Sequence, residues 1–503
     1  MLTKTVCMTA YEDIVNLAQR RSLFYPASEI YQNAPAGMLN FGPYGAAIRR
    51  KMIDVWRKEL VRKENFLEIE GAQLMPEDVF KASGHLTNFN DPFTQCKKCN
   101  TIHRADKLLE EVTKEQFKEA MPVGQLTAGI REHKLKCPKC KGELADVRQF
   151  NMMVRADVGA ASKTACYLRP ETCQVLFTDF LRMTKTMRIK LPQGLAQVGE
   201  VFRNEISPRQ TLLRQVEFVQ MESEVFFDSE KVNEIEHFEE IQDYKINILR
   251  AGKTENELIK AKDLVSKKIV SGKIIAYYLA RTQQLYEQYG FAVEKMRFRE
   301  LDDTERAFYA KEAWDFEVNL SLGWTELIAN NYRTDYDLKG HALGSKKDLS
   351  YVYDTGKKII PHVWETSIGL GRTMYAILEN TYHKEGERTW LSLPYAIAPI
   401  QASIFPLLSN KPELVEKAKN LFNELRDCFE LFYDDSGSIG KRYARMDEVG
   451  CPFCVTIDFD SIANKDVTMR ERDSTKQARV KITDLRTVLF DLISERKTIN
   501  DLK

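Results

Sequence analysis

Residues 199–227, GEVFRNEISPRQTLLRQVEFVQMESEVFF, are typical of two strands joined by a loop that contains Pro208. Successive side chains of a strand point to opposite faces of a sheet, so Arg203 and Glu205 are expected on one face of the first strand. The same alternation gives the second strand a face of charged, polar and aromatic side chains: Arg214, Phe218, Gln220 and Glu222. The pair of strands is therefore expected to carry arginines, carboxylates and a ring on one rigid surface.

Two interpretations of this surface are open. A solvated hairpin with cross-strand ion pairs is the simpler one. The apolar residues at alternate positions and the ring among the charges favour a binding surface instead. Arginine offers a planar fork of donors that matches phosphate oxygens, and the ring of Phe218 can stack on a purine. Because no GxxxxGK[ST] and no strand-linked GxGxxG occurs, the pattern predicts a nucleotide site that is neither a P-loop nor a Rossmann site.

A second stretch, PHVWETSIGLGRTMYAILEN at 361–380, predicts a strand that turns into a helix through two glycines. Glu365 and Ser367 fall on one face of that strand, and Arg372 falls in the first helical turn. A helix start and an arginine both favour negative charge. GLGR alone would be ordinary helix punctuation, but together with the first stretch it indicates a phosphate-binding group.

Composition restricts the class of protein. At 503 residues the chain is long enough for about three domains, with 43% hydrophobic and 29% charged residues. The 74 basic and 73 acidic residues nearly cancel, so only a local patch would attract nucleic acid. No apolar run of membrane-spanning length and no secretory signal is visible, which predicts a cytoplasmic protein without a membrane segment.

Two cysteine pairs bracket a lysine-rich segment. CKKC and CPKC enclose 37 residues, a spacing that suits tetrahedral Zn²⁺ held by four thiolates. The predicted ligands are Cys96, Cys99, Cys137 and Cys140. A closed site of four cysteines leaves no open position, so the zinc is expected to be structural. A third pair, Cys451 and Cys454, has no partner pair and is expected to be two partly buried thiols, with a metal or redox site as the alternative.

The ordered set of motifs resembles the dimeric glycyl-tRNA synthetases of class II over nearly the whole chain. FRNE at 202–205 with Arg214 resembles motif 2, GLGR ending at Arg372 resembles motif 3, and the helix and strand ending at Pro76 resemble motif 1. YLRPET at 167–172, HLTNFNDPF at 85–93 and SIGKRYARMDEVG at 438–450 also match that family.

The resemblance implies an α+β fold: a class II antiparallel sheet with flanking helices, a zinc-binding insert, and a C-terminal α/β anticodon-binding domain. It divides the chain into catalytic segments with motifs 1, 2 and 3 at 1–90, 149–228 and 301–392, the zinc insert at 91–148, a helical insertion at 229–300 and the anticodon-binding domain at 393–503. A homodimer formed through motif 1 is also implied.

The resemblance also assigns the sites. Arg203 would contact the α-phosphate of ATP and Arg372 the γ-phosphate, which makes these two the catalytic residues, while Phe218 and Arg372 would hold the adenine between them. Glu326 would lie near the nucleotide and its Mg²⁺ ions. The full expected ATP site is Arg203, Asn204, Glu205, Leu213, Arg214, Gln215, Phe218, Glu326, Leu327, Gly369 and Arg372.

Glycine would be bound by acidic groups around its ammonium, at Glu171, Glu222 and Glu365, with Ser367 beside them and Arg104 close by. A substrate without a side chain is selected by excluding any Cβ, not by filling a pocket. The expected activity is ATP-dependent activation of glycine and its transfer to the 3′ end of tRNA(Gly). Two alternatives remain: a non-catalytic nucleic-acid-binding relative, and an enzyme for serine, threonine, proline or histidine, which share motifs 2 and 3.

Overall fold

The computed structural model describes residues 10–502 except 35, 114–120, 162–163, 207 and 209. A nine-stranded sheet forms the largest body, in the order β13-β12-β14-β15-β16-β19-β11-β10-β3. Its middle is antiparallel: β14 (Met296–Glu300), β15 (Glu312–Leu320), β16 (Gly323–Thr334), β19 (His362–Gly369), β11 (Glu217–Phe227) and β10 (Gln193–Phe202). At the two flanks, β12 (Lys245–Leu249) pairs parallel with β14 and β3 (Leu67–Glu68) pairs parallel with β10.

The alternation predicted for β11 decides what each face of this sheet meets. Met221, Val225 and Phe227 point into the main core, where α2 (Pro43–Trp56), α10 (Lys273–Gln288) and α12 (Leu370–Thr381) pack. On the other face, Phe226 stacks on Phe180 of α7 (Cys173–Met187), with the ring centroids 4.3 Å apart. Glu222 and Glu224 point to that second face and lie beside the helix. One face of the sheet therefore packs on the main apolar core, and the other carries polar side chains.

The predicted helical insertion at 229–300 is only partly helical. It contains α8 (Phe238–Ile241), α9 (Ala261–Ser266) and α10, but also β12, β13 (Glu257–Lys260) and β14, which extend the nine-stranded sheet. Ile246 and Ile248 of β12 are fully buried, and Asn247 between them points to the opposite face of the strand. The period-two spacing of these β-branched residues favours a strand, and it was hidden by the surrounding Lys- and Glu-rich sequence.

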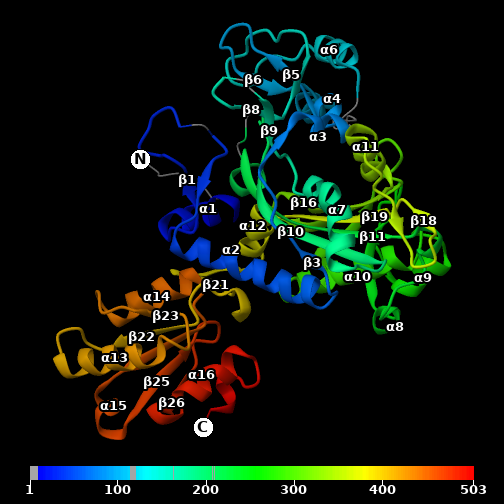
Figure 1. The fold of residues 1–503 in the computed structure, drawn as a ribbon. Helices are drawn as coiled ribbons and strands as arrows, with labels where there is room; N and C mark the ends of the chain where they lie inside the picture. Colours follow the sequence, from blue (N-terminus) through cyan, green and yellow to red (C-terminus); the bar gives the residue numbers. More distant parts are fainter. Residues whose placement is uncertain are drawn as a thin grey trace.

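The segment with the cysteine pairs folds around its own small sheet, β6-β5-β7 (Ile102–Arg104, Asn90–Gln95 and Arg148–Asn151). Helices α5 (Ala105–Thr113) and α6 (Val123–Glu132) pack on it through a small core that includes Leu109, Leu126 and Ile130. Figure 1 shows this module as a separate lobe at the top of the molecule, above the sheet that carries β10 and β11.

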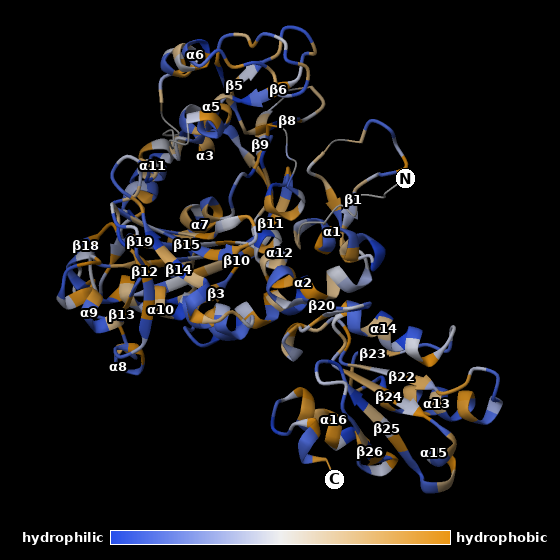
Figure 2. Cartoon of the chain, turned by 180° about the vertical axis from the view of Figure 1, so that it is seen from behind, coloured by the Kyte–Doolittle hydropathy of each residue, from blue (hydrophilic) through white to orange (hydrophobic). Residues whose placement is uncertain are grey.

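The C-terminal part is a second domain, drawn in orange and red in Figure 1. Its five-stranded sheet has the order β23-β22-β24-β25-β26 (Leu431–Tyr433, Ala402–Pro406, Phe453–Ile457, Asp466–Glu471 and Gln477–Lys481). The first three strands are parallel and the last two antiparallel, and they pack against α13 (Pro412–Leu425), α14 (Ile439–Val449) and α16 (Leu485–Ile493). In Figure 2 the helices change between orange and blue along their length, as expected for helices with one buried face.

Two further findings bear on the sequence predictions. Cys451 and Cys454 are not partly buried but fully buried in this domain, at 0% and 1% exposure, because both pack in a small apolar cluster with Phe405 and Met446, Cys451 just before the central strand β24 and Cys454 within it. Among the described residues, no helix is long and apolar enough to cross a membrane.

Candidate active site

A cavity of about 570 Å³ opens on the polar face of the large sheet. Ten of the eleven residues expected to bind ATP line it, and Asn204 lies outside the lining, where its backbone N–H donates to Met152. From the expected glycine set, Arg104, Glu171 and Ser367 line the cavity, whereas Glu222 and Glu365 lie deeper, at 0% and 3% exposure. Motifs that are far apart in the sequence therefore meet at one site.

The structure corrects the predicted positions of the motif 2 arginines. The ladder between β10 and β11 ends at the pair Phe202 and Glu217, so Arg203, Glu205 and Arg214 lie in the connecting loop and not on the strands. The loop backbone finds other partners: the N–H of Arg203 donates to Val216, 2.8 Å away. Placing these side chains on a loop at the mouth of the cavity lets them reach a ligand above the sheet.

Each arginine of this end is oriented by protein groups. The Arg203 guanidinium donates to the carbonyl of Pro170 at 3.1 Å and lies 5.4 Å from the Phe218 ring. Arg214 pairs with Glu205 at 2.6 Å. Both side chains line the cavity, and guanidinium groups held in this way suit a phosphate chain.

Arg372 closes this end from helix α12. Its Nε donates to the carbonyl of Leu213 at 3.2 Å, and its Nη1 lies 3.2 Å from the Glu326 carboxylate. The helix can approach the motif 2 loop because residue 371 is glycine: a Cβ there would lie 2.3 Å from Gln215 Oε1. The pairing of Arg372 with Glu326 holds a cation and a carboxylate at the same edge of the cavity.

Arg104 approaches the cavity from the small lobe. It is bonded to Asp91 at 2.9 Å and to Asp106 at 3.0 Å, and Asp91 in turn lies 3.5 Å from Arg214. These contacts group Arg104 with the motif 2 loop. Burial, opposed by Arg104, raises the pKa of Asp91 to about 6. The sequence analysis missed Asp91, although it belongs to the quoted stretch HLTNFNDPF.

The opposite end of the cavity is acidic. Strand register brings Glu222 beside Ser367 and Glu224 beside Glu365 across β11 and β19. Glu222 accepts from the backbone N–H of Thr172 at 2.9 Å, and Gln220 donates to Ser367 at 3.1 Å. The second oxygen of Glu222 is buried without a hydrogen-bond partner. An open acceptor in this position suits a donor on a ligand.

Glu171 is held by donors on one of its two oxygens. Its Oε1 accepts from the Cys173 thiol at 2.9 Å and the Gln174 amide at 2.8 Å, and His85 Nε2 lies 3.3 Å away. Ser83 in turn fixes His85 through its Nδ1, at 2.8 Å. This chain of contacts orients the carboxylate and leaves its Oε2 for other partners.

Arg333 is a central residue that the sequence analysis did not identify. It is 1% exposed, forms two hydrogen bonds with Asp337 at 2.7 and 2.9 Å, and lies 3.1 Å from Glu365. Asn331 donates to the other oxygen of Glu365 at 2.7 Å. The available signal was a charged residue within the apolar strand sequence LIANNYR, since an arginine is rarely buried unless it is paired.

The carboxyl groups of this end differ in their pKa values. Burial opposes ionisation of Glu171, but His85, Arg333 and Cys173 hold its pKa well below the usual value. Burial raises the pKa of Glu365 to about 8. Burial and the adjacent Glu365 raise the pKa of Glu224 well above its usual value, and neither oxygen of Glu224 has a hydrogen-bond partner. An added cation would favour ionisation of these groups, so the pocket is suited to an ammonium.

The four predicted cysteine ligands come together in the small lobe. The Sγ atoms of Cys96 and Cys140 are 3.5 Å apart, those of Cys99 and Cys137 are 3.7 Å apart, and all four lie within 4.8 Å of one another. Zn–S bonds of about 2.3 Å in a tetrahedron give S···S separations of about 3.8 Å. The geometry of the four thiols therefore fits a tetrahedral ion.

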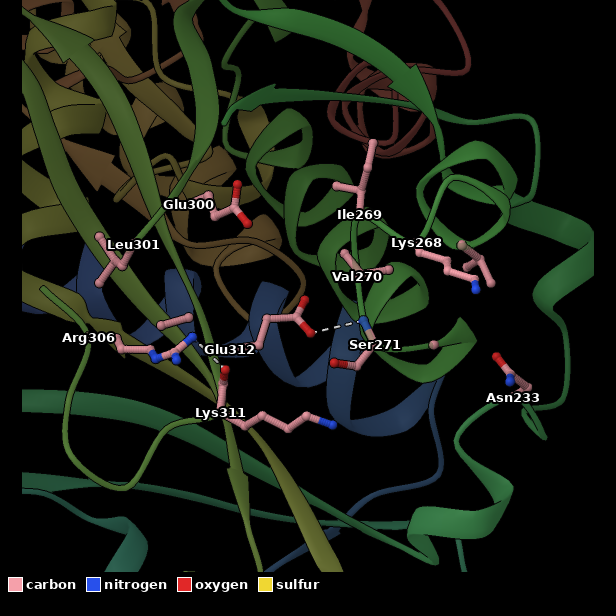
Figure 3. Close-up of a pocket in the computed structure, with 13 residues that line it drawn as sticks. Asn233, Lys268, Ile269, Val270, Ser271, Glu300, Leu301, Arg306, Lys311 and Glu312 are labelled. Carbon is pink, nitrogen blue, oxygen red and sulfur yellow. Dashed lines mark hydrogen bonds between the residues drawn. The ribbon is translucent and has the colours of Figure 1, made fainter. Parts of the chain in front are cut away.

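A second cavity, of about 550 Å³, lies away from these residues, between the start of α10 and strands β14 and β15. Figure 3 shows Glu312 directed at the backbone of Ser271, from which it accepts a hydrogen bond of 2.9 Å. This cavity contains none of the residues predicted to bind a nucleotide or an amino acid.

Known proteins share the two domains and the fold of this chain. Residues 158–381 match the model of the tRNA synthetase class II core domain (G, H, P, S and T), and residues 401–492 match that of the anticodon binding domain. A solved structure of Giardia lamblia prolyl-tRNA synthetase in complex with prolyl-adenylate superposes with a TM-score of 0.61 at 14% identity, covering 97% of this chain and 80% of that one. The fold and the site define a class II aminoacyl-tRNA synthetase.

Proteins with similar sequences show which family of class II synthetases the chain belongs to. The glycine–tRNA ligase of Methanococcus vannielii is 35% identical, over 94% of this chain and 98% of its own. Those of Methanothrix thermoacetophila and Methanocaldococcus jannaschii are 35% and 34% identical, over 97% and 96% of this chain. The chain belongs to the family of glycine–tRNA ligases.

Proposed function

We propose that this protein activates glycine with ATP, forming glycyl-adenylate, and transfers the glycyl group to the 3′ end of tRNA(Gly). The observation that carries the proposal is one cavity with two chemically different ends. Arg203, Arg214 and Arg372 surround one end, and the carboxyl groups of Glu171, Glu222 and Glu365 surround the other. A triphosphate and an ammonium would bind at opposite ends and meet between them.

The arginine end would bind ATP. Arg203 would contact the α-phosphate, and Arg372 would contact the γ-phosphate while covering the adenine opposite Phe218. Such residues neutralise the charge that develops during transfer and cost no reorganisation, because protein carbonyls already orient them. Mg²⁺ would be held by Glu326 and the phosphates, and it would supply further charge neutralisation.

The acidic end would bind glycine through its ammonium. The pKa of Glu171 is held well below its usual value, which favours the ionised form, and the ammonium would favour ionisation of Glu222 and Glu365, whose pKa values are raised by burial. Arg333 would serve as a positioning residue, because its guanidinium lies 3.1 Å from the carboxylate of Glu365. Three carboxyl groups gathered around the ammonium would leave little room at the α-carbon, so an amino acid with a Cβ would be excluded.

The first chemical step then requires no activated nucleophile. The carboxylate of glycine, already an anion, attacks the α-phosphorus in line, and pyrophosphate leaves opposite to it. Holding both reactants in one cavity makes this step effectively unimolecular, and the arginines stabilise the charged transition state.

We also propose that the four-cysteine site binds Zn²⁺ and that its role is structural. The thiol separations suit a tetrahedral ion, and four protein ligands leave no position for a substrate. His103 Nε2 lies 3.4 Å from the Cys137 sulfur, where it can stabilise a thiolate. Zinc would hold the two ends of the lobe together next to Arg104 and Asp91.

A homodimer and a cytoplasmic location complete the proposal. The homodimer is supported by the resemblance of α2 and the strand ending at Pro76 to motif 1. The location is supported by the cysteines, because the nine that the structure describes are all free thiols, as expected in a reducing compartment. Sedimentation of the purified protein tests the dimer: a single species of twice the chain mass is expected, and a monomer at micromolar concentration would contradict it.

Charging of tRNA tests the activity. Purified protein is incubated with ATP, a tRNA pool and each radiolabelled amino acid in turn, and acid-precipitable label is counted. Label from glycine alone is expected. Label from another amino acid would contradict the assignment of the acidic end, and absence of label with every amino acid would favour a non-catalytic relative.

A further inference from the structure

Phe308 is an uncovered aromatic ring at the catalytic cavity. It belongs to the segment between β14 and β15, and it lines the cavity although 58% of the residue is exposed. Large apolar side chains that remain this exposed inside a concave site are candidates for contact with a ligand. The contacts assigned above to ATP and glycine leave Phe308 without a role.

The ring has a fixed position. Tyr309 and Tyr336 pack against it in T-shaped contacts, with centroid separations of 5.2 and 5.5 Å. It also lies against Gly84, where an added Cβ would be 3.5 Å from the ring tip. A ring held by two neighbours and still open on its remaining surface is preorganised for stacking.

Phe308 lies at the glycine end of the cavity. Its neighbour Tyr309 places its ring 4.0 Å from the guanidinium of Arg333, which pairs with Glu365. Phe218, the ring assigned to ATP, is at the other end. Six residue steps along β11 lead from Phe218 to Glu224, the register partner of Glu365, which corresponds to about 20 Å of strand. Phe218 and Phe308 therefore lie at different ends of the cavity that both of them line.

The second chemical step requires a nucleoside at the glycine end. A ribose hydroxyl of the terminal adenosine of tRNA attacks the glycyl carbonyl and forms an ester bond, while the anhydride bond to the AMP phosphate breaks. AMP leaves with the bonding electrons, and the hydroxyl proton passes to water. The adenine of that nucleoside must then lie near the carboxyl of glycine, while the adenine of the glycyl-adenylate still occupies the platform at Phe218.

We propose that Phe308 is the platform on which the terminal adenine of tRNA stacks during glycyl transfer. Stacking on a fixed aromatic ring is a common way to hold an unpaired base, and it places the attached ribose without needing base-specific hydrogen bonds. This inference rests on the proposed function, since it assumes that glycyl-adenylate forms in the cavity.

The two half-reactions separate the inference from that assumption. Glycine-dependent exchange of pyrophosphate into ATP, without tRNA, reports on the activation site. Transfer from enzyme-bound glycyl-adenylate to tRNA(Gly) in a single turnover reports on Phe308. The variant Phe308→Leu removes the flat ring and keeps an apolar side chain, and Phe308→Tyr restores a ring.

Phe308→Leu is expected to keep exchange within about twofold of the parent and to slow transfer about tenfold or more, and Phe308→Tyr is expected to recover most of the transfer rate. A tRNA with 2-aminopurine as its terminal base gives a direct readout: its fluorescence should be quenched on binding the parent protein and the Tyr variant but not the Leu variant. Unchanged transfer in Phe308→Leu, or an equal loss of exchange and transfer, would overturn the inference. Loss of exchange in the parent itself would instead contradict the proposed function.

Discussion

Arg203 shows how one side chain links sequence and chemistry. Its place in FRNE predicted a phosphate contact, but not the carbonyl of Pro170 that orients its guanidinium at 3.1 Å. Replacement of Arg203 by Ala is expected to reduce glycine-dependent pyrophosphate exchange by about 10²- to 10³-fold, the usual loss when one preorganised electrostatic group is removed.

The matched control is Arg131→Ala, because Arg131 pairs with Asp146 on the surface of the small lobe at 2.5 Å and does not line the cavity. That variant should exchange like the parent. Thermal unfolding of both variants should be close to that of the parent, since Arg203 lines an open cavity. Near-normal exchange by Arg203→Ala would contradict its assignment.

Glu365 gives the activity a predicted dependence on pH. Burial raises the pKa of this carboxyl to about 8, so below pH 8 the group carries a proton that must leave when an ammonium binds. The value of kcat/KM for glycine is therefore expected to rise with pH up to about 8 and then to level off. In Glu365→Gln this rise should be absent and the KM for glycine higher. A flat profile of the parent between pH 6.5 and 8.5 would contradict the assignment.

Only some residues of the candidate site could be predicted from the sequence. The residue types expected to bind ATP and glycine could be taken from strand alternation and motif resemblance. Arg333 and His85 could not, because their roles depend on partners far away in the sequence: Arg333 meets Glu365 across β16 and β19, and His85 reaches Glu171 from another segment.

At the scale of elements, the two cysteine pairs bring the two ends of the small lobe together. Loss of one ligand should release the metal and loosen this lobe, because zinc binding and local folding are coupled. Cys137→Ser is expected to lower the zinc content of the purified protein from about one per chain to near zero and to make the segment 91–148 more sensitive to protease. Cys428→Ser is the control, since Cys428 is exposed and outside the site. Full zinc content in Cys137→Ser would contradict the four-cysteine site.

Strands near the motifs were predictable and those of the 229–300 segment were not. In β11 the alternation of Val219 and Met221 with Gln220 and Glu222 is strong enough to define both faces. In β12 and β13 only short apolar patterns occur within a charged segment, and their pairing with each other and with β14 is decided by the whole sheet. In motif 2 the predicted first strand is too long, because β10 ends at Phe202 and the connecting loop begins at Arg203.

At the scale of the whole molecule, a buried ion-pair network joins the catalytic body to the C-terminal domain. Asp447 of α14 forms two bonds of 2.9 Å with Arg470 and one of 3.1 Å with Arg388, which belongs to β21 (Arg388–Leu391). Asp447 is 2% exposed. Its removal leaves the buried Arg470 and the partly exposed Arg388 without this partner.

Asp447→Asn is expected to lower the free energy of unfolding of the C-terminal domain by about 3 kcal/mol, the usual cost of breaking a buried ion pair on one side. Urea denaturation, monitored through a spectroscopic signal of the C-terminal domain, would measure this free energy. Because the cavity lies in the other domain, glycine-dependent exchange should remain close to that of the parent, while charging of tRNA should fall. An unchanged unfolding free energy would show that the network does not stabilise the domain.

The central claim is that one cavity binds ATP at its arginine end and glycine at its acidic end. The most direct test is pyrophosphate exchange into ATP by the purified protein, with each of the twenty amino acids supplied separately and no tRNA present. Exchange with glycine alone is predicted. Exchange that is supported by another amino acid and not by glycine would contradict the assignment of Glu171, Glu222 and Glu365.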